Sequence, residues 1–171
     1  MAVEMNSEKG EFMRDALCLS RFLEAQDGVY GLALAEIQRG KKQGHWMWFI
    51  FPQIRGLGTS ATARHYAITS KAEAAAYLCH PILGQRLLAC CSALMSLNGK
   101  SATDVFGFPD DLKLRSCLTL FSTVAEQQSL FSKVLSKYYA GVPDDRTLEI
   151  LGCAKFHGCS ISTSMIPNGG L

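Results

Sequence analysis

The sequence has few of the features that would place a protein in a membrane, a secretory pathway or a nucleic-acid complex. Its net charge is only +2, which is too small by itself to imply a nucleic-acid or membrane partner. The longest sharp apolar run covers residues 46–51 and is closed by Pro52, far short of the ~20 residues that a membrane span needs. The first 14 residues are mixed and charged, without the apolar stretch of a secretory signal.

Cysteine and histidine are present, but not in the spacing of a disulfide framework or a metal site. The seven cysteines are odd in number and no two of them form a CxxC pair. The four histidines show no HxxxH or HxH spacing, so we expect neither a metal nor another cofactor. Most of the cysteines are interpreted as small core residues. Together these features predict a reducing, cytoplasmic location.

What remains is an ordinary globular composition with short helical patterns. Hydrophobic residues make up 48% and charged residues 19% of the 171 positions, so one domain should fold without a disulfide or metal. Neither an internal repeat nor an alternation of strands and helices is visible. The sequence predicts an all-α fold, a single compact multi-helix domain with short capped helices over residues 15–152. A flexible N-terminal arm (1–14) and a disordered C-terminal tail (153–171) flank it.

Local signals predict where several helices begin and which faces they bury. Hydroxyl or carboxylate side chains precede apolar runs and are expected to cap helices; they are Ser60, Ser70 with Glu73, Ser101 with Asp104, Asp110 or Asp111, Ser129, and Asp144 or Asp145. His80 precedes Pro81 at another candidate start. A helix ending near Arg39 is expected to bury Val29, Leu32, Ala33 and Ile37, and the helix over 81–97 to bury a stripe from Leu83 to Leu94.

Several strings in the chain carry a resemblance to a known family. They are RFLEAQ at 21–26, HWMWFIFPQ at 45–53, GLG at 56–58, YAI at 66–68, YL at 77–78, HPILGQRL at 80–87, FG at 106–107, DDLKLRS at 110–116, TLF at 119–121 and TLEIL at 147–151. With them, residues 20–152 resemble the bacterial and algal family called domain of unknown function 1810. The resemblance implies a mainly α-helical fold and no established reaction. Some members carry the label calpastatin, but such protease inhibitors are expected to be disordered and repetitive, and this sequence is neither.

The nonapeptide at 45–53 is the first candidate site. If it is extended, Trp46 and Trp48 share one face; if it is helical, His45 and Trp48 are neighbours. One interpretation is an aromatic platform, with His45 as a hydrogen-bonding or acid–base group and Gln53 contacting a polar ligand. The other is a core segment whose indole N–H groups find carbonyl partners. The polar residues at its two ends keep the first interpretation open.

A second candidate set consists of polar residues elsewhere in the chain. An arginine such as Arg86 beside a helix N-terminus would suit a phosphate or carboxylate. Arg86 and Lys113, which lies near a helix start, are predicted ligand-binding residues together with His45, Trp48 and Gln53. The same candidate set includes His65, His80, Asp110, Asp111 and Arg115. The alternative for the whole set is helix capping and surface charge. A third possibility, nucleic-acid binding by the basic residues at 39–42 beside the tryptophans, is disfavoured by the small patch and the low net charge.

The functional prediction is therefore a general one. We expect a domain that binds or acts on a small polar or anionic molecule in a pocket around residues 45–53, without a membrane or nucleic-acid partner. The alternative is a non-enzymatic protein-interaction module in which this segment is ordinary core. The sequence identifies no reaction and no protein partner, and whether the protein is an enzyme stays open.

Overall fold

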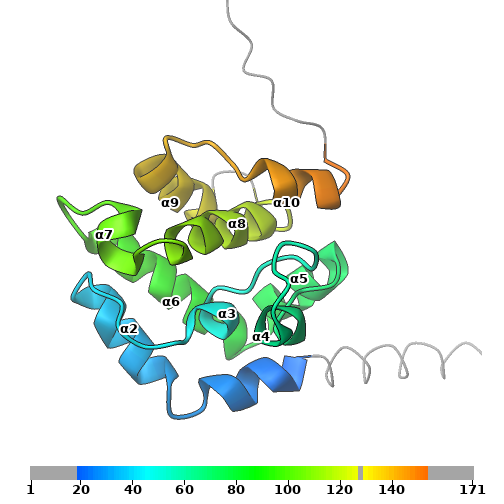
Figure 1. Cartoon of the computed structure of the whole chain (residues 1–171), viewed down its shortest axis with the longest axis horizontal. Helices are drawn as coiled ribbons and strands as arrows, with labels where there is room; N and C mark the ends of the chain where they lie inside the picture. The colour runs from blue at the N-terminus through cyan, green and yellow to red at the C-terminus, as the bar shows by residue number, and fades with distance from the viewer. Residues whose placement is uncertain (1–18, 127–128, 154–171) are drawn as a thin grey trace, which may run out of the picture.

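The fold is all-α, as predicted. A computed structural model describes residues 19–126 and 129–153. Residues 19–26 are helical, and nine further helices follow (Figure 1): α2 (Tyr30–Gln38), α3 (Met47–Ile50), α4 (Ala61–His65), α5 (Lys71–Cys79), α6 (Leu83–Ser96), α7 (Ala102–Phe106), α8 (Asp110–Ser122), α9 (Leu130–Tyr139) and α10 (Asp145–Ile150). No strand occurs in these two ranges, where β pairing is limited to an isolated bridge between Ile54 and Ile68. The predicted arm and, apart from Cys153, the predicted tail lie outside the described residues.

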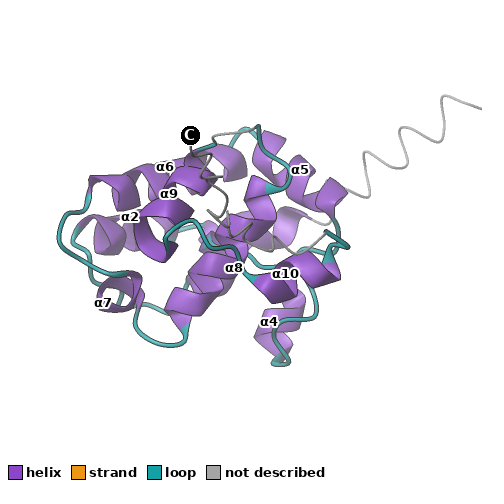
Figure 2. Cartoon of the chain, turned by 90° about the horizontal axis from the view of Figure 1, so that it is seen from above, coloured by secondary structure: helices purple, strands orange, loops and turns teal. Residues whose placement is uncertain are grey.

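Two helices, α6 and α8, organise the packing (Figure 2). Helix α6 packs against α2, α5 and α9, and α8 packs against α5, α7, α9 and α10. The predicted apolar stripe of α6 is buried, and it meets buried residues of α8. Its members are Leu83, Leu87, Cys90, Cys91 and Leu94. In the view of Figure 1, the short helix α3 lies in the middle of the molecule, with α2 on one side and α8 above it.

Most of the predicted helix caps are present. The side chains of Ser60, Ser70, Ser101, Ser129 and Asp144 each accept a hydrogen bond from the backbone N–H three residues later. Helix α8 differs, because Pro109 occupies its N-cap position and Asp110 and Asp111 lie inside the first turn. Their carboxylates still lie where the helix dipole favours negative charge.

Two details of the predicted helices are wrong. Leu32 is 54% exposed, because α2 turns the neighbouring Ala33 and Ile37 toward α6 and one residue corresponds to about 100° around a helix. Helix α6 begins at Leu83 rather than at Pro81. His80 nevertheless acts as a cap, since its Nδ1 accepts hydrogen bonds from the N–H groups of Ile82 and Leu83 at 3.2 and 3.3 Å.

Helices α2 to α10 are short, and the longest of them, α6, has 14 residues. Across residues 19–126 and 129–153, no single helix is both long and apolar enough to cross a membrane. Helices α5 and α6 reach the required length and composition only as a pair, and that pair is bent by 85°.

Candidate functional site

The nonapeptide at 45–53 is partly core and partly surface. It forms the four-residue helix α3, preceded by Trp46. Trp46, Met47, Ile50 and Phe51 are buried, and the Trp46 and Phe51 rings pack near the Phe106 ring with centroids 6.2 and 5.8 Å away. Trp48 is half-buried and His45 is exposed. The segment is therefore helical at its centre, and its two tryptophans have different environments.

A buried carboxylate holds the loop that leads into this segment. Glu36 of α2 accepts hydrogen bonds from the backbone N–H groups of Gln43 and Gly44, at 2.7 and 3.0 Å, and from Nε1 of Trp46 at 2.8 Å. Burial alone would raise the pKa of Glu36, but these three donors and the nearby Lys42 ammonium lower it below its ordinary value. Glu36 thus stays ionised and fixes residues 43–46 against α2.

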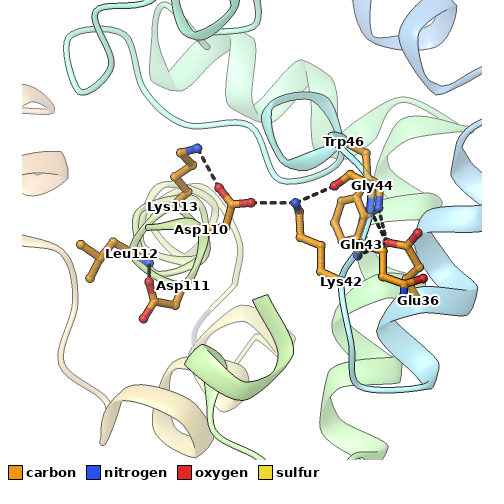
Figure 3. Close-up of polar contacts among 9 residues, drawn as sticks. All are labelled: Glu36, Lys42, Gln43, Gly44, Trp46, Asp110, Asp111, Leu112 and Lys113. Atoms are coloured by element: carbon orange, nitrogen blue, oxygen red, sulfur yellow. Dashed lines mark hydrogen bonds and ion pairs between the residues drawn. The ribbon is translucent and has the colours of Figure 1, made fainter. Parts of the chain in front are cut away.

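Two lysines converge on one carboxylate beside this loop (Figure 3). The Lys42 Nζ donates to Asp110 Oδ2 at 2.7 Å and to the carbonyl of Gly44 at 2.6 Å. The Lys113 Nζ donates to the other oxygen, Asp110 Oδ1, at 2.7 Å. Burial would raise the pKa of Asp110, but the two lysines outweigh it and lower that pKa. Asp110 is therefore an ionised bridge between two ammonium groups.

The same lysines lie against the two tryptophans. The Lys42 Nζ is 5.2 Å from the centre of the Trp46 ring, and the Lys113 Nζ is 4.4 Å from the centre of the Trp48 ring. Both distances are within the range of cation–π attraction. The Lys42 side chain is only 8% exposed, whereas that of Lys113 is 22% exposed. Lys113 is therefore the more open of the two lysines, and it lies on the half-buried Trp48.

The structure joins some of the predicted site residues and separates others. Trp48 and Lys113, far apart in the chain, are in contact. His45 precedes the buried Trp46 and is exposed. Gln53 is half-buried, and its carbonyl accepts a hydrogen bond from the Ile68 N–H at 2.8 Å. Arg86 of α6 contacts Gln26 and Tyr30 instead of the lysine cluster, as described below.

Three residues of the cluster were not predicted as site residues. In the sequence, Lys42 stands out only among the basic residues considered for nucleic-acid binding, Asp110 only as a possible cap and a member of the second polar set, and Glu36 not at all. Each acquires its role from a partner on another element. The one local signal is the pair of aspartates at 110 and 111. Asp111 is turned away from Lys42 (Figure 3), and its carboxylate accepts hydrogen bonds from Thr103 and from the Leu112 N–H.

Other reactive groups in the described part of the chain form no comparable site. Within residues 19–126 and 129–153, no group of three His, Cys, Asp or Glu side chains is placed to hold a metal ion. Cys90, Cys91 and Cys117 are buried free thiols. Burial raises the pKa of Cys90 to about 12 and raises the pKa values of Cys91 and Cys117 as well. Such thiols stay protonated and are poor nucleophiles.

Comparison with known proteins identifies the family. Residues 16–151 match the family model described as "Protein of unknown function (DUF1810)", and the chain belongs to this family. A solved structure similar to it is that of the conserved hypothetical protein Rv1873 from Mycobacterium tuberculosis. That protein is 46% identical, the match covers 80% of this chain and 97% of that one, and the TM-score is 0.77. No significant match was found among curated proteins.

Proposed function

We propose that this domain binds a small anionic molecule at the surface formed by Lys42, Trp48, Asp110 and Lys113, which we call the lysine–indole site. The observation that supports it best is the convergence of two ammonium groups on one carboxylate. A single aspartate balances only one of these two charges. An anionic ligand would balance the other and complete an alternating array of charges.

The charge of Glu36 does not remove this imbalance at the surface. The charges of Glu36, Lys42, Asp110 and Lys113 sum to zero. However, Glu36 is buried and already accepts three N–H hydrogen bonds on the loop side of the cluster. Asp110 and Lys113 are the members most open to solvent, so a ligand approaching them meets an excess of positive charge from the lysines.

Lys113 has the donors that a ligand would need. A lysine ammonium has three N–H donors and no acceptor. In the described ranges, the hydrogen bond of Lys113 is to Asp110, and its ammonium also lies on the Trp48 ring. Its remaining donors suit carboxylate or phosphate oxygens. The half-buried indole of Trp48 provides an apolar surface beside the charge, as is usual in small-molecule sites.

The other predicted ligand residues take different places in this proposal. His45 and Gln53 flank α3 in the sequence, and we place them at the edge of the site, where they would contact only a larger ligand. Arg86 is instead proposed to support α3. We further propose the reducing, cytoplasmic location, which is supported by the free state of all five cysteines in the described residues.

The alternative function is a protein-interaction module in which residues 45–53 serve as core. The burial of Trp46, Met47, Ile50 and Phe51 favours it. In that case the two lysines and Asp110 would only fasten residues 40–46 to the start of α8. The two functions differ in one measurable property, since only the first requires saturable binding of an anion near Lys113.

The test is a thermal-shift titration of the full chain with sodium phosphate, sodium acetate and, at matched ionic strength, sodium chloride. The wild type is compared with Lys113→Met and Lys113→Arg. The matched control is Lys133→Met, which removes the same charge from an exposed position of α9. Phosphate or acetate should raise the melting temperature of the wild type and of Lys133→Met saturably and above the effect of chloride, because ligand that binds only the folded state stabilises it.

Loss of one charged hydrogen bond should weaken binding by Lys113→Met roughly tenfold or more, since 1.4 kcal/mol corresponds to a factor of ten. Lys113→Arg should keep part of the affinity. Two results would remove the proposal: no anion effect beyond chloride in the wild type, or equal effects in Lys113→Met and Lys133→Met. Either would favour the interaction-module alternative.

A further inference from the structure

The position of Trp48 depends on a helix that cannot support itself. Helix α3 has four residues, whereas isolated helices shorter than about 12 residues are marginal even in favourable sequences. Its last carbonyl groups have no partner within the helix. Whatever satisfies those carbonyls therefore also sets where Trp48 lies relative to Lys113.

A buried glutamine satisfies one of them. Gln26, in the helical segment 19–26, is buried, and its Nε2 donates to the carbonyl of Phe49 at 2.8 Å. The same Nε2 lies 3.0 Å from the hydroxyl of Tyr77, which is buried in α5. Phe49 is the residue directly after Trp48. The amide of Gln26 is thus a side-chain cap at the end of α3.

Arg86 determines the orientation of the Gln26 side-chain amide. The Arg86 Nη1 donates to Gln26 Oε1 at 3.2 Å, and a guanidinium has only donors. The oxygen of Gln26 must therefore face Arg86, which leaves the nitrogen to face Phe49. Arg86 itself lies over the Tyr30 ring, with its Cζ atom 4.8 Å from the ring centre. A flipped amide would set donor against donor and carbonyl against carbonyl.

We infer that Gln26 and Arg86 are positioning residues that hold α3, and with it the Trp48 indole, in place for the lysine–indole site. The functional importance of this positioning rests on the proposed function, but the position of α3 and Trp48 can itself be measured without a ligand. It assigns Arg86 a role in supporting α3. The ammonium of Lys113 can lie on the Trp48 ring only while α3 stays in this place.

The experiment records the two tryptophan indole N–H resonances of the ligand-free full chain by NMR, with Trp48→Phe used to assign them. Gln26→Glu keeps an acceptor for Arg86 but removes the shorter of the two hydrogen bonds to the Phe49 carbonyl, and it leaves the one from the Tyr77 hydroxyl at 3.5 Å. Arg86→Met is a milder change at a half-buried position and frees the amide to turn. Tyr138→Phe is the control, because it removes a hydrogen bond to the Leu94 carbonyl between α9 and α6, away from α3.

We expect the Trp48 indole resonance to shift and to exchange faster with solvent in Gln26→Glu, and to shift less in Arg86→Met. The Trp46 resonance, held by Glu36, should stay in place, and Tyr138→Phe should move neither. The inference is overturned if the Trp48 resonance is unchanged in folded Arg86→Met and Gln26→Glu, or if both indoles move together as in a general loosening. If Gln26→Glu does not fold, Arg86→Met decides alone. Phosphate titration of the wild type decides separately whether the site binds an anion.

Discussion

Replacing Glu36 by glutamine should destabilise the protein although the two side chains have nearly the same shape. The Glu36 carboxylate accepts three hydrogen bonds, from two backbone N–H groups and one indole. Hydrogen bonds to a charged group contribute about 1.5–3 kcal/mol each and neutral ones about 0.5–1.5 kcal/mol. All three donors point to the same oxygen, Oε2, so a glutamine can keep its oxygen at that position, but each hydrogen bond then becomes a neutral one and is weaker by about 1 kcal/mol.

The loss expected for Glu36→Gln is therefore about 2–4 kcal/mol in the free energy of unfolding. For a chain of this size, each kcal/mol lowers the melting temperature by roughly 2–4 °C, so a drop of about 5–15 °C should be visible by circular dichroism at pH 7. The control is Glu24→Gln, which makes the same substitution at an exposed position of the segment 19–26 and should change the melting temperature little.

The difference between wild type and Glu36→Gln should also depend on pH. The pKa of Glu36 is lowered in the folded protein, so at low pH the unfolded chain takes up this proton first. The carboxylate therefore stabilises the fold above its unfolded pKa of about 4.3, and this contribution is lost as the pH falls through the folded pKa. The gap between the two melting curves should narrow below about pH 4.3. A variant that melts like the wild type at pH 7, or a gap that widens in acid, would refute this account of Glu36.

Other predictions concern buried thiols and a helix end. In the folded protein Cys90, Cys91 and Cys117 should react with a thiol reagent far more slowly than Cys79 and Cys153, because burial keeps them protonated; mass mapping of the labelled sites checks this, and rapid labelling of all five would contradict it. A reductant should leave the melting temperature unchanged, because the five cysteines of the described residues are free thiols. A clear drop would reveal a native disulfide, since losing one typically costs about 2–5 kcal/mol. Lys137→Met should lower the stability by about 1 kcal/mol, because the Lys137 ammonium caps the carbonyls of Leu94, Met95 and Leu97 at the end of α6; an unchanged denaturation midpoint would show that water replaces it.

The parts of the fold that were predictable are those fixed by neighbours in the chain. Ser60, Ser70 and Ser101 were recognisable as caps because each partner lies only three residues away. The all-α class followed from helical spacing in the apolar residues. Leu32 shows where this reasoning stops: spacing identifies a helix, but the helices packed against it decide which of several apolar residues faces inward.

The candidate site depends mostly on distant contacts, and the sequence predicted only part of it. Trp48 and Lys113 were chosen for their chemistry, and the structure brings them within cation–π distance. That Trp48 and Lys113 form one cluster with Lys42 and Asp110 could not be predicted, because this cluster needs residues 40–46 to lie against the start of α8. The two tryptophans of one short segment differ for a similar reason. Trp46 meets the Glu36 carboxylate of α2, while Trp48 faces Lys113 of α8.

The central claim is that an anion binds at Lys113 beside Trp48. The most direct measurement is an NMR titration of the wild-type chain with inorganic phosphate at constant ionic strength, following the Trp48 and Trp46 indole N–H groups and the backbone amides of the first turn of α8. The account predicts saturable shifts of the Trp48 indole and of the amides at Asp110 to Lys113, with a much smaller change at Trp46. Shifts that do not saturate, or that are largest at an exposed basic residue elsewhere such as Arg64 or Lys133, would contradict it.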